Sequence, residues 1–161
     1  MAETIKIGIA DMNITKSPDS LCTIGLGSCV GIAIRDTVLG IGGLVHIMLP
    51  DSTQVKSSMN IAKFADTGIP ELVRKMELLG CKRSHMEAKI AGGAQMFSFQ
   101  NKTDLLGIGE RNVEATKAAL KKLGIPIKSE DVGLNYGRTV IFYPENGKYE
   151  IRAVGKDVKF I

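Results

Sequence analysis

The sequence contains no tryptophan and only two histidines, and aromatic residues make up just 5% of its 161 residues. Lysine and arginine outnumber aspartate and glutamate by 21 to 17, but the basic residues are spread along the chain and no aromatics interleave with them. Proteins that bind nucleic acids usually combine a clustered basic surface with stacking aromatic side chains. We therefore expect no nucleic-acid partner and only a mild preference for acidic ones.

The amino-acid sequence also gives no sign of disulfides, membrane spans or export signals. Three cysteines without paired spacing are typical of reduced thiols in a cytosolic protein. The longest apolar stretch, at 38–50, is too short and too rich in glycine to cross a bilayer. The N-terminal residues carry an acid at Glu3 and lack the basic and apolar regions of a signal peptide. We expect a soluble, cytoplasmic protein that does not insert into membranes.

Apolar periodicity predicts strands near both ends of the chain and helices between them. The expected strands are 5–9, 21–25, 30–35, 41–49, 88–93, 126–134, 137–143 and 148–154, with a hairpin turn at Asn146-Gly147. The expected helices are 57–69, a second that begins at Pro70 and ends before Gly80, and a third that runs from an N-cap at Asn112 to Leu123. The order of these elements predicts an α+β fold in a single domain over residues 1–161.

The segments GLGSCV (25–30) and HIMLP (46–50) bring a cysteine and a histidine into neighbouring strands. If these strands form a hairpin centred on the turn at 37–38, Cys29 and His46 lie directly opposite each other. Their Cβ atoms would then be about 4.5–5.5 Å apart. A shift of one residue in the register would place the two side chains on opposite faces of the sheet.

A cysteine beside a histidine is typical of nucleophilic catalysis. An isolated thiol is a slow nucleophile at neutral pH, but an adjacent imidazole raises the thiolate fraction and later protonates the leaving group. Thr23 is available to orient the ring of His46, and the open backbone at Gly27 and Ser28 is available to bind an oxyanion.

A structural role for these residues competes with this interpretation, because free cysteines and satisfied histidines are common in protein cores. Cys22 and Cys81 fit structural thiols, and Cys81-x3-His85 lacks a second pair with the spacing of a zinc site. The segment 27–31 matches the spacing of a nucleophile elbow, but a strand rather than a helix follows it.

Five blocks spread over nearly the whole chain resemble the chemoreceptor glutamine deamidase family, CheD. One departure is Gly133-Leu134, where the family tends to have a glycine pair. The blocks are GLGSCV at 25–30, HIMLP at 46–50, AKIAGGAQMF at 88–97, GIGERN at 107–112 and DVGLNYGR at 131–138.

The resemblance implies a catalytic set of Cys29, His46 and Thr23, and a three-layer α/β sandwich similar to cysteine-dependent toxin deamidases. It implies hydrolysis of glutamine side chains on the cytoplasmic helical bundle of methyl-accepting chemotaxis receptors, through a thioester and without metal or organic cofactor. The activity would be cytoplasmic, at receptor arrays, with the phosphatase CheC as partner. The alternative is a non-catalytic module that engages CheC and modulates dephosphorylation of the response regulator.

Overall fold

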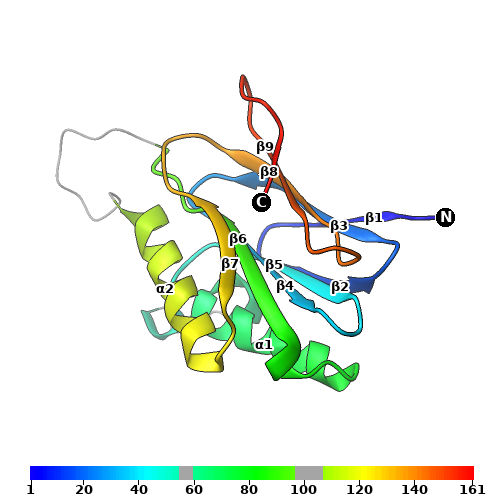
Figure 1. The fold of residues 1–161 in the computed structure, drawn as a ribbon. Coiled ribbons are helices and arrows are strands. Elements are labelled where there is room, and N and C mark those ends of the chain that lie inside the picture. Colours follow the sequence, from blue (N-terminus) through cyan, green and yellow to red (C-terminus); the bar gives the residue numbers. More distant parts are fainter. Residues whose placement is uncertain (55–59, 97–106) are drawn as a thin grey trace.

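The computed structural model describes residues 1–54, 60–96 and 107–161, which form two five-stranded sheets and a layer of helices (Figure 1). The first sheet has the order β1 (Thr4–Ile7), β3 (Ser20–Leu26), β8 (Arg138–Phe142), β9 (Tyr149–Arg152) and β10 (Lys159–Phe160). The second has the order β2 (Met12–Lys16), β5 (Ile41–Ile47), β4 (Val30–Asp36), β6 (Met86–Gly92) and β7 (Ile127–Val132). The α-helices are α1 (Ala65–Leu78) and α2 (Ile108–Leu123), and single 3-10 turns occur at Ser52–Gln54, Ile61–Lys63 and Arg83–His85.

The elements stack in three layers. Both α-helices pack on one face of the second sheet, and the first sheet covers its other face (Figure 1). Two apolar clusters result, one under the helices and one between the sheets, which we call the inter-sheet core. The arrangement confirms the expected α+β class and its three-layer sandwich.

The strands β4 and β5 lie at the centre of the molecule and are buried on both faces. In β4, Ile32 and Ile34 face the helices, whereas Ala33 faces the inter-sheet core. In β5, Val45 faces the helices and Leu44 faces the inter-sheet core. This double burial explains why the segment 41–49 is apolar at both parities, and it confirms the prediction of a strand there.

No strand was expected between residues 9 and 21, and this expectation is wrong. Residues 12–16 form β2, which pairs antiparallel with β5 at the edge of the second sheet. An edge strand has a single neighbour and a partly exposed face, so polar residues are tolerated in it and weaken its apolar signal.

One helix replaces the two that were expected before residue 80. Residues 57–59 lie outside the described residues, and α1 begins at Ala65 and continues through Pro70 to Leu78. The proline removes one hydrogen bond, the one to the carbonyl of Asp66, close to the start of the helix. The buried face of α1 is continuous across this position, from Ile69 to Met76, and holds the helix together.

The third expected helix begins earlier than predicted. α2 begins at Ile108, so Asn112 lies within it, fully buried, and is not its N-cap. The prediction of an end at Gly124 is confirmed, because this glycine has a φ of 76° and caps the helix with a left-handed residue.

Two turns contain a residue with a positive φ. β8 and β9 pair antiparallel on either side of Asn146-Gly147, as expected, and Gly147 has a φ of 79°. Leu134, which stands where the CheD family tends to have the second glycine of a pair, has a φ of 62°. A leucine is thus held in a backbone conformation that favours glycine.

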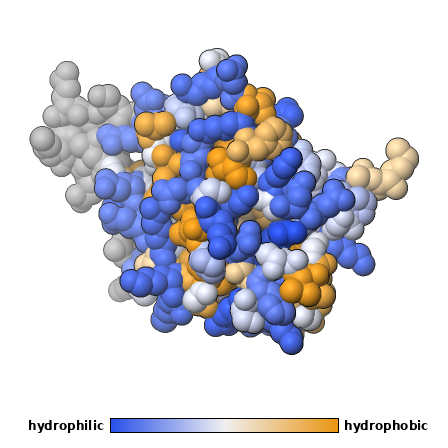
Figure 2. Space-filling model, viewed as in Figure 1, coloured by the Kyte–Doolittle hydropathy of each residue, from blue (hydrophilic) through white to orange (hydrophobic). Residues whose placement is uncertain are grey.

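Hydrophilic residues cover most of the face that shows α2, β6 and β7, and hydrophobic residues appear between them as separate groups (Figure 2). No helix among the described residues is long and apolar enough to cross a membrane.

Asp36 is a fully buried carboxylate that closes the turn after β4. It accepts hydrogen bonds from the backbone N–H groups of Val38 and Leu39, at 2.9 Å each, and of Lys82, at 3.0 Å. Burial acts to raise the pKa of this carboxyl, but the three donors outweigh it and the pKa is lowered.

We expect Asp36→Asn to lower the free energy of unfolding by about 1–3 kcal/mol at neutral pH, because an amide N–H₂ would face the N–H of Lys82. Since folding lowers the pKa, the carboxylate stabilises the fold above its unfolded-state pKa and ceases to do so as the pH falls through its folded-state pKa. The difference between the variants should therefore shrink in acid. Urea denaturation over a pH series measures it, with the exposed Asp157→Asn as control. Equal effects of the two substitutions would contradict the role of Asp36.

Candidate functional site

Thr23 of β3 and His46 of β5 meet across the inter-sheet core, where both are fully buried. The hydroxyl of Thr23 donates a hydrogen bond to the carbonyl of Ile7, at 2.8 Å, and its Oγ1 lies 2.7 Å from Nδ1 of His46. A hydroxyl has one hydrogen, and Ile7 takes it, so Nδ1 must be the donor to Thr23. The chain of hydrogen bonds therefore places the lone pair of the imidazole on Nε2.

The other ring nitrogen of His46 is a base without a partner. Nε2 is buried and makes no hydrogen bond to any described residue. Burial lowers the pKa of His46 to about 4, so the ring is neutral at neutral pH. A neutral imidazole with a free lone pair can accept a proton from an approaching acid.

The predicted pairing of Cys29 with His46 is wrong by two residues. The partner of His46 in β4 is Gly31, because the last pair of the hairpin is Asp36 with Ile41 and the loop is 37–40. A two-residue shift preserves the face of the sheet. Cys29 continues the line of β4 and packs against the inter-sheet core, so it lies diagonally from His46 on the same face. In a regular ladder such diagonal neighbours are about 7–8 Å apart, with their Cβ atoms somewhat closer, and Gly31 has no side chain beside the imidazole.

Cys29 is partly buried, at the border of the inter-sheet core. Burial raises the pKa of this thiol, and a hydrogen bond from its own backbone N–H only partly offsets the effect. Because its pKa is raised, this thiol is protonated at neutral pH in the resting protein. The resting pair is a neutral thiol and a neutral imidazole.

The backbone beside Cys29 supplies one free donor. The N–H of Gly27 donates to the carbonyl of Gly25, at 3.1 Å, and is engaged within the turn. The N–H of Ser28 has no hydrogen-bond partner among the described residues. Met96 covers Gly27 so closely that an added Cβ would lie 3.1 Å from its Cγ.

The remaining thiols lie away from this site. Cys22 precedes Thr23 in β3, and its side chain therefore points to the outer face of the first sheet. Cys81 is buried, and burial together with the charge of Asp36 raises its pKa to about 11. Among the residues that the structure describes, no three histidine, cysteine, aspartate or glutamate side chains group as metal ligands.

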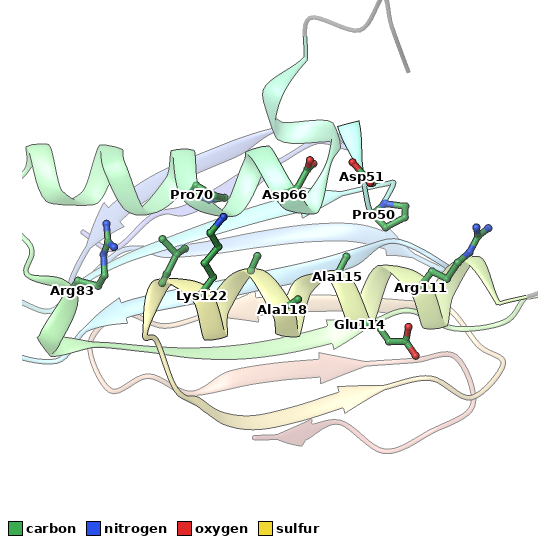
Figure 3. Close-up of a pocket in the computed structure, with 12 residues that line it drawn as sticks. Pro50, Asp51, Asp66, Pro70, Arg83, Arg111, Glu114, Ala115, Ala118 and Lys122 are labelled. Atoms are coloured by element: carbon green, nitrogen blue, oxygen red, sulfur yellow. The ribbon is translucent and has the colours of Figure 1, made fainter. Parts of the chain in front are cut away.

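A groove of about 880 Å³ lies between α1 and α2, on the opposite side of the second sheet from the inter-sheet core. Figure 3 shows it along α2, with Arg111 near one end and Lys122 near the other. Neither a cysteine nor a histidine is found among the described residues that line it. The groove therefore adds no thiol or imidazole to those of the inter-sheet core.

One residue beside the site was misread from the sequence. Asn112, expected as an N-cap, contacts the backbone next to both Cys29 and His46. The only available signal was its place in the block GIGERN, which carried the resemblance without a role for the asparagine.

The chain matches a family model described as CheD chemotactic sensory transduction over residues 48–153. It is 59% identical over 161 residues to the "Probable chemoreceptor glutamine deamidase CheD" of Lachnoclostridium phytofermentans, and the match covers all of both chains. It is 53% identical over 159 residues to the protein of the same name in Clostridium novyi, covering 99% of this chain and 98% of that protein. The corresponding protein of Clostridium kluyveri is 55% identical over 157 residues, covering 98% of this chain and 97% of the relative.

We expect nitrogen NMR of histidine-labelled protein to show Nε2 of His46 unprotonated at neutral pH, with protonation at about pH 4. The reason is that burial disfavours the imidazolium while Nδ1 keeps its proton for Thr23. The variant His46→Asn assigns the signals of the two histidines. A midpoint near 6.5, the ordinary value for histidine, would contradict the buried environment.

Proposed function

The chain belongs to the CheD family, and from this premise we propose that it is a protein-glutamine glutaminase that converts glutamine side chains of chemotaxis receptors to glutamate. The names of its relatives, chemoreceptor glutamine deamidases, support this substrate. The observation that carries the proposal is the neutral Nε2 of His46, which has no hydrogen-bond partner among the described residues and faces the same core as the partly buried Cys29. Most buried polar side-chain atoms are hydrogen-bonded, so a free imidazole nitrogen beside a cysteine favours a chemical role over a purely structural one.

In the first half of the reaction, Sγ of Cys29 attacks the carboxamide carbon as Nε2 of His46 takes the thiol proton. The carbonyl electrons move to oxygen, where the N–H of Ser28 stabilises the negative charge. When the intermediate collapses, the C–N bond breaks, and the imidazolium gives its proton to the departing nitrogen. Ammonia and a thioester result.

In the second half, water replaces the amine. Nε2 of His46 takes a proton from water as its oxygen attacks the thioester carbon, the S–C bond breaks, and the proton returns to sulfur. The products are glutamate and ammonia, and no oxidation or reduction takes place. Thr23 acts throughout as a neutral acceptor that holds the ring orientation, so it favours the imidazolium less than a carboxylate would.

The setting of this reaction follows from the proposed substrate. The substrate glutamines would lie on the cytoplasmic helical domain of the receptors, and the enzyme would act in the cytoplasm at receptor arrays. We place the deamidase unit over residues 1–161, since full-length relatives align along the entire chain. The resemblance to the family supports CheC as a partner, and a purely CheC-binding role is the outcome that would follow if the chemistry fails.

We expect Cys29→Ala and His46→Asn each to lower kcat for deamidation of a receptor cytoplasmic fragment by roughly 10⁴-fold or more, because each removes a group that handles the bond being broken. Thr23→Val should lower kcat by roughly 10²-fold, since the ring remains but loses its fixed orientation. Ammonia release and the mass of receptor peptides measure the reaction. Cys22→Ala, a change on the outer face of the same sheet, is the control and should leave the rate unchanged. Full activity of the Cys29→Ala variant would contradict the proposed mechanism.

A further inference from the structure

The segments that carry Cys29 and His46 diverge at the site itself. β4 and β5 pair as far as Val30 with Ile47, and beyond this rung they separate. On the β5 side, the N–H of Met48 turns to the carbonyl of Lys63, at 2.8 Å. Cys29 is therefore the first residue of one arm of a fork and Met48 the first residue of the other, while His46 lies in the paired stem, opposite Gly31.

The arm of the fork that carries Cys29 is hydrogen-bonded to the residues that follow β6. The N–H of Gly93 donates to the carbonyl of Cys29, and the N–H of Ala94 donates to the carbonyl of Gly27, each at 2.8 Å. These bonds hold the Cys29 arm along β6, but none of them joins it to β5. The spacing between the two arms needs another contact.

The side chain of Asn112 supplies that contact from α2. Its Nδ2 donates to the carbonyl of Ser28, at 2.8 Å, and to the carbonyl of Met48, at 2.9 Å. Ser28 directly precedes Cys29, and Met48 lies two residues after His46. The side chain is fully buried, and its Oδ1 has no hydrogen-bond partner among the residues that the structure describes. Both contacts are acceptors, so the position requires two donors on one nitrogen, which an aspartate or a leucine does not provide.

Glycines seat α2 close enough for this bridge. A Cβ added to Gly109 would lie 2.4 Å from the carbonyl oxygen of Ala94, and one added to Gly93 would lie 2.2 Å from Cγ2 of Val113. Gly93 also has a φ of 66°. The first turn of α2 therefore rests directly on the backbone that follows β6, and the blocks AKIAGG and GIGERN meet at this contact.

We propose that Asn112 is a positioning residue for the deamidation, which sets the distance between the thiol of Cys29 and Nε2 of His46 by joining the arm that carries Cys29 to the arm that follows His46. It touches neither substrate nor reacting atoms, and the inference rests on the proposed function. Loss of the bridge lets the arms separate, so that proton transfer from sulfur to nitrogen fails more often while the surface that binds the receptor is kept.

The test uses two variants. Asn112→Asp is nearly isosteric and removes the two N–H donors. Asn112→Ser is too short to bridge the two carbonyls and serves as the second variant if Asn112→Asp does not fold. Circular dichroism melting establishes that each variant is folded. With a receptor cytoplasmic fragment, we expect kcat to fall roughly 10²-fold with little change in KM.

A second readout needs no receptor. The rate of alkylation of Cys29 by iodoacetamide, followed by peptide mass spectrometry, is measured with and without His46→Asn in each background. We expect His46→Asn to slow alkylation in the otherwise wild-type protein and to have no further effect beside Asn112→Asp or Asn112→Ser. Such non-additivity shows that Asn112 acts through the Cys29–His46 pair.

Thr116→Val is the matched control. Thr116 lies one turn further along α2, is also fully buried, and has a hydroxyl without a partner. Its isosteric replacement should leave kcat and the alkylation rate unchanged. Equal losses in Thr116→Val, or an undiminished effect of His46→Asn in folded Asn112 variants, would overturn the inference alone. If His46→Asn leaves the alkylation rate of the otherwise wild-type protein unchanged, the proposed mechanism, on which this inference rests, is contradicted instead.

Discussion

The hydrogen bond between Thr23 and Nδ1 of His46 is the interaction on which the candidate site depends. It joins the two sheets through their shared core, and it is supported by the further bond from Thr23 to the carbonyl of Ile7. Because the threonine proton goes to Ile7, the imidazole proton has to lie on Nδ1. The reactive nitrogen is thus determined by a backbone carbonyl on the far side of the threonine.

Burial divides the chemistry between two environments. His46 is fully buried in a central strand, which keeps the ring neutral and its orientation fixed. Cys29 lies at the end of the neighbouring strand, where the sheet opens and the residue is only partly buried. The nucleophile therefore lies nearer to solvent than the base does. The raised pKa of the thiol and the lowered pKa of the imidazole both favour the neutral pair, so ionisation has to accompany attack on the substrate.

Periodicity in the sequence was sufficient to locate the central strands, the hairpin at Asn146-Gly147 and the α+β class, since these depend on local burial and turn chemistry. Register was predicted less well, because it depends on the length of the loop at 37–40, which no apolar pattern encodes. The error of two residues left Cys29 and His46 on the same face, because side chains alternate with a period of two. The strand β2 and the continuous helix α1 were missed where a neighbour, rather than the local sequence, supplies the stability.

Asn112 illustrates why the rest of the site was beyond local patterns. As an N-cap it satisfied every local rule, yet its carboxamide bonds to residues 84 and 64 positions away. Thr23 comes from the first sheet, His46 from the second and Asn112 from the helical layer, so each layer of the sandwich contributes one polar side chain at the same end of the fold. The layers themselves are held by apolar burial, which is not directional, and these three side chains supply the directional contacts. The three-layer stacking is therefore a condition of the site as well as a support for it.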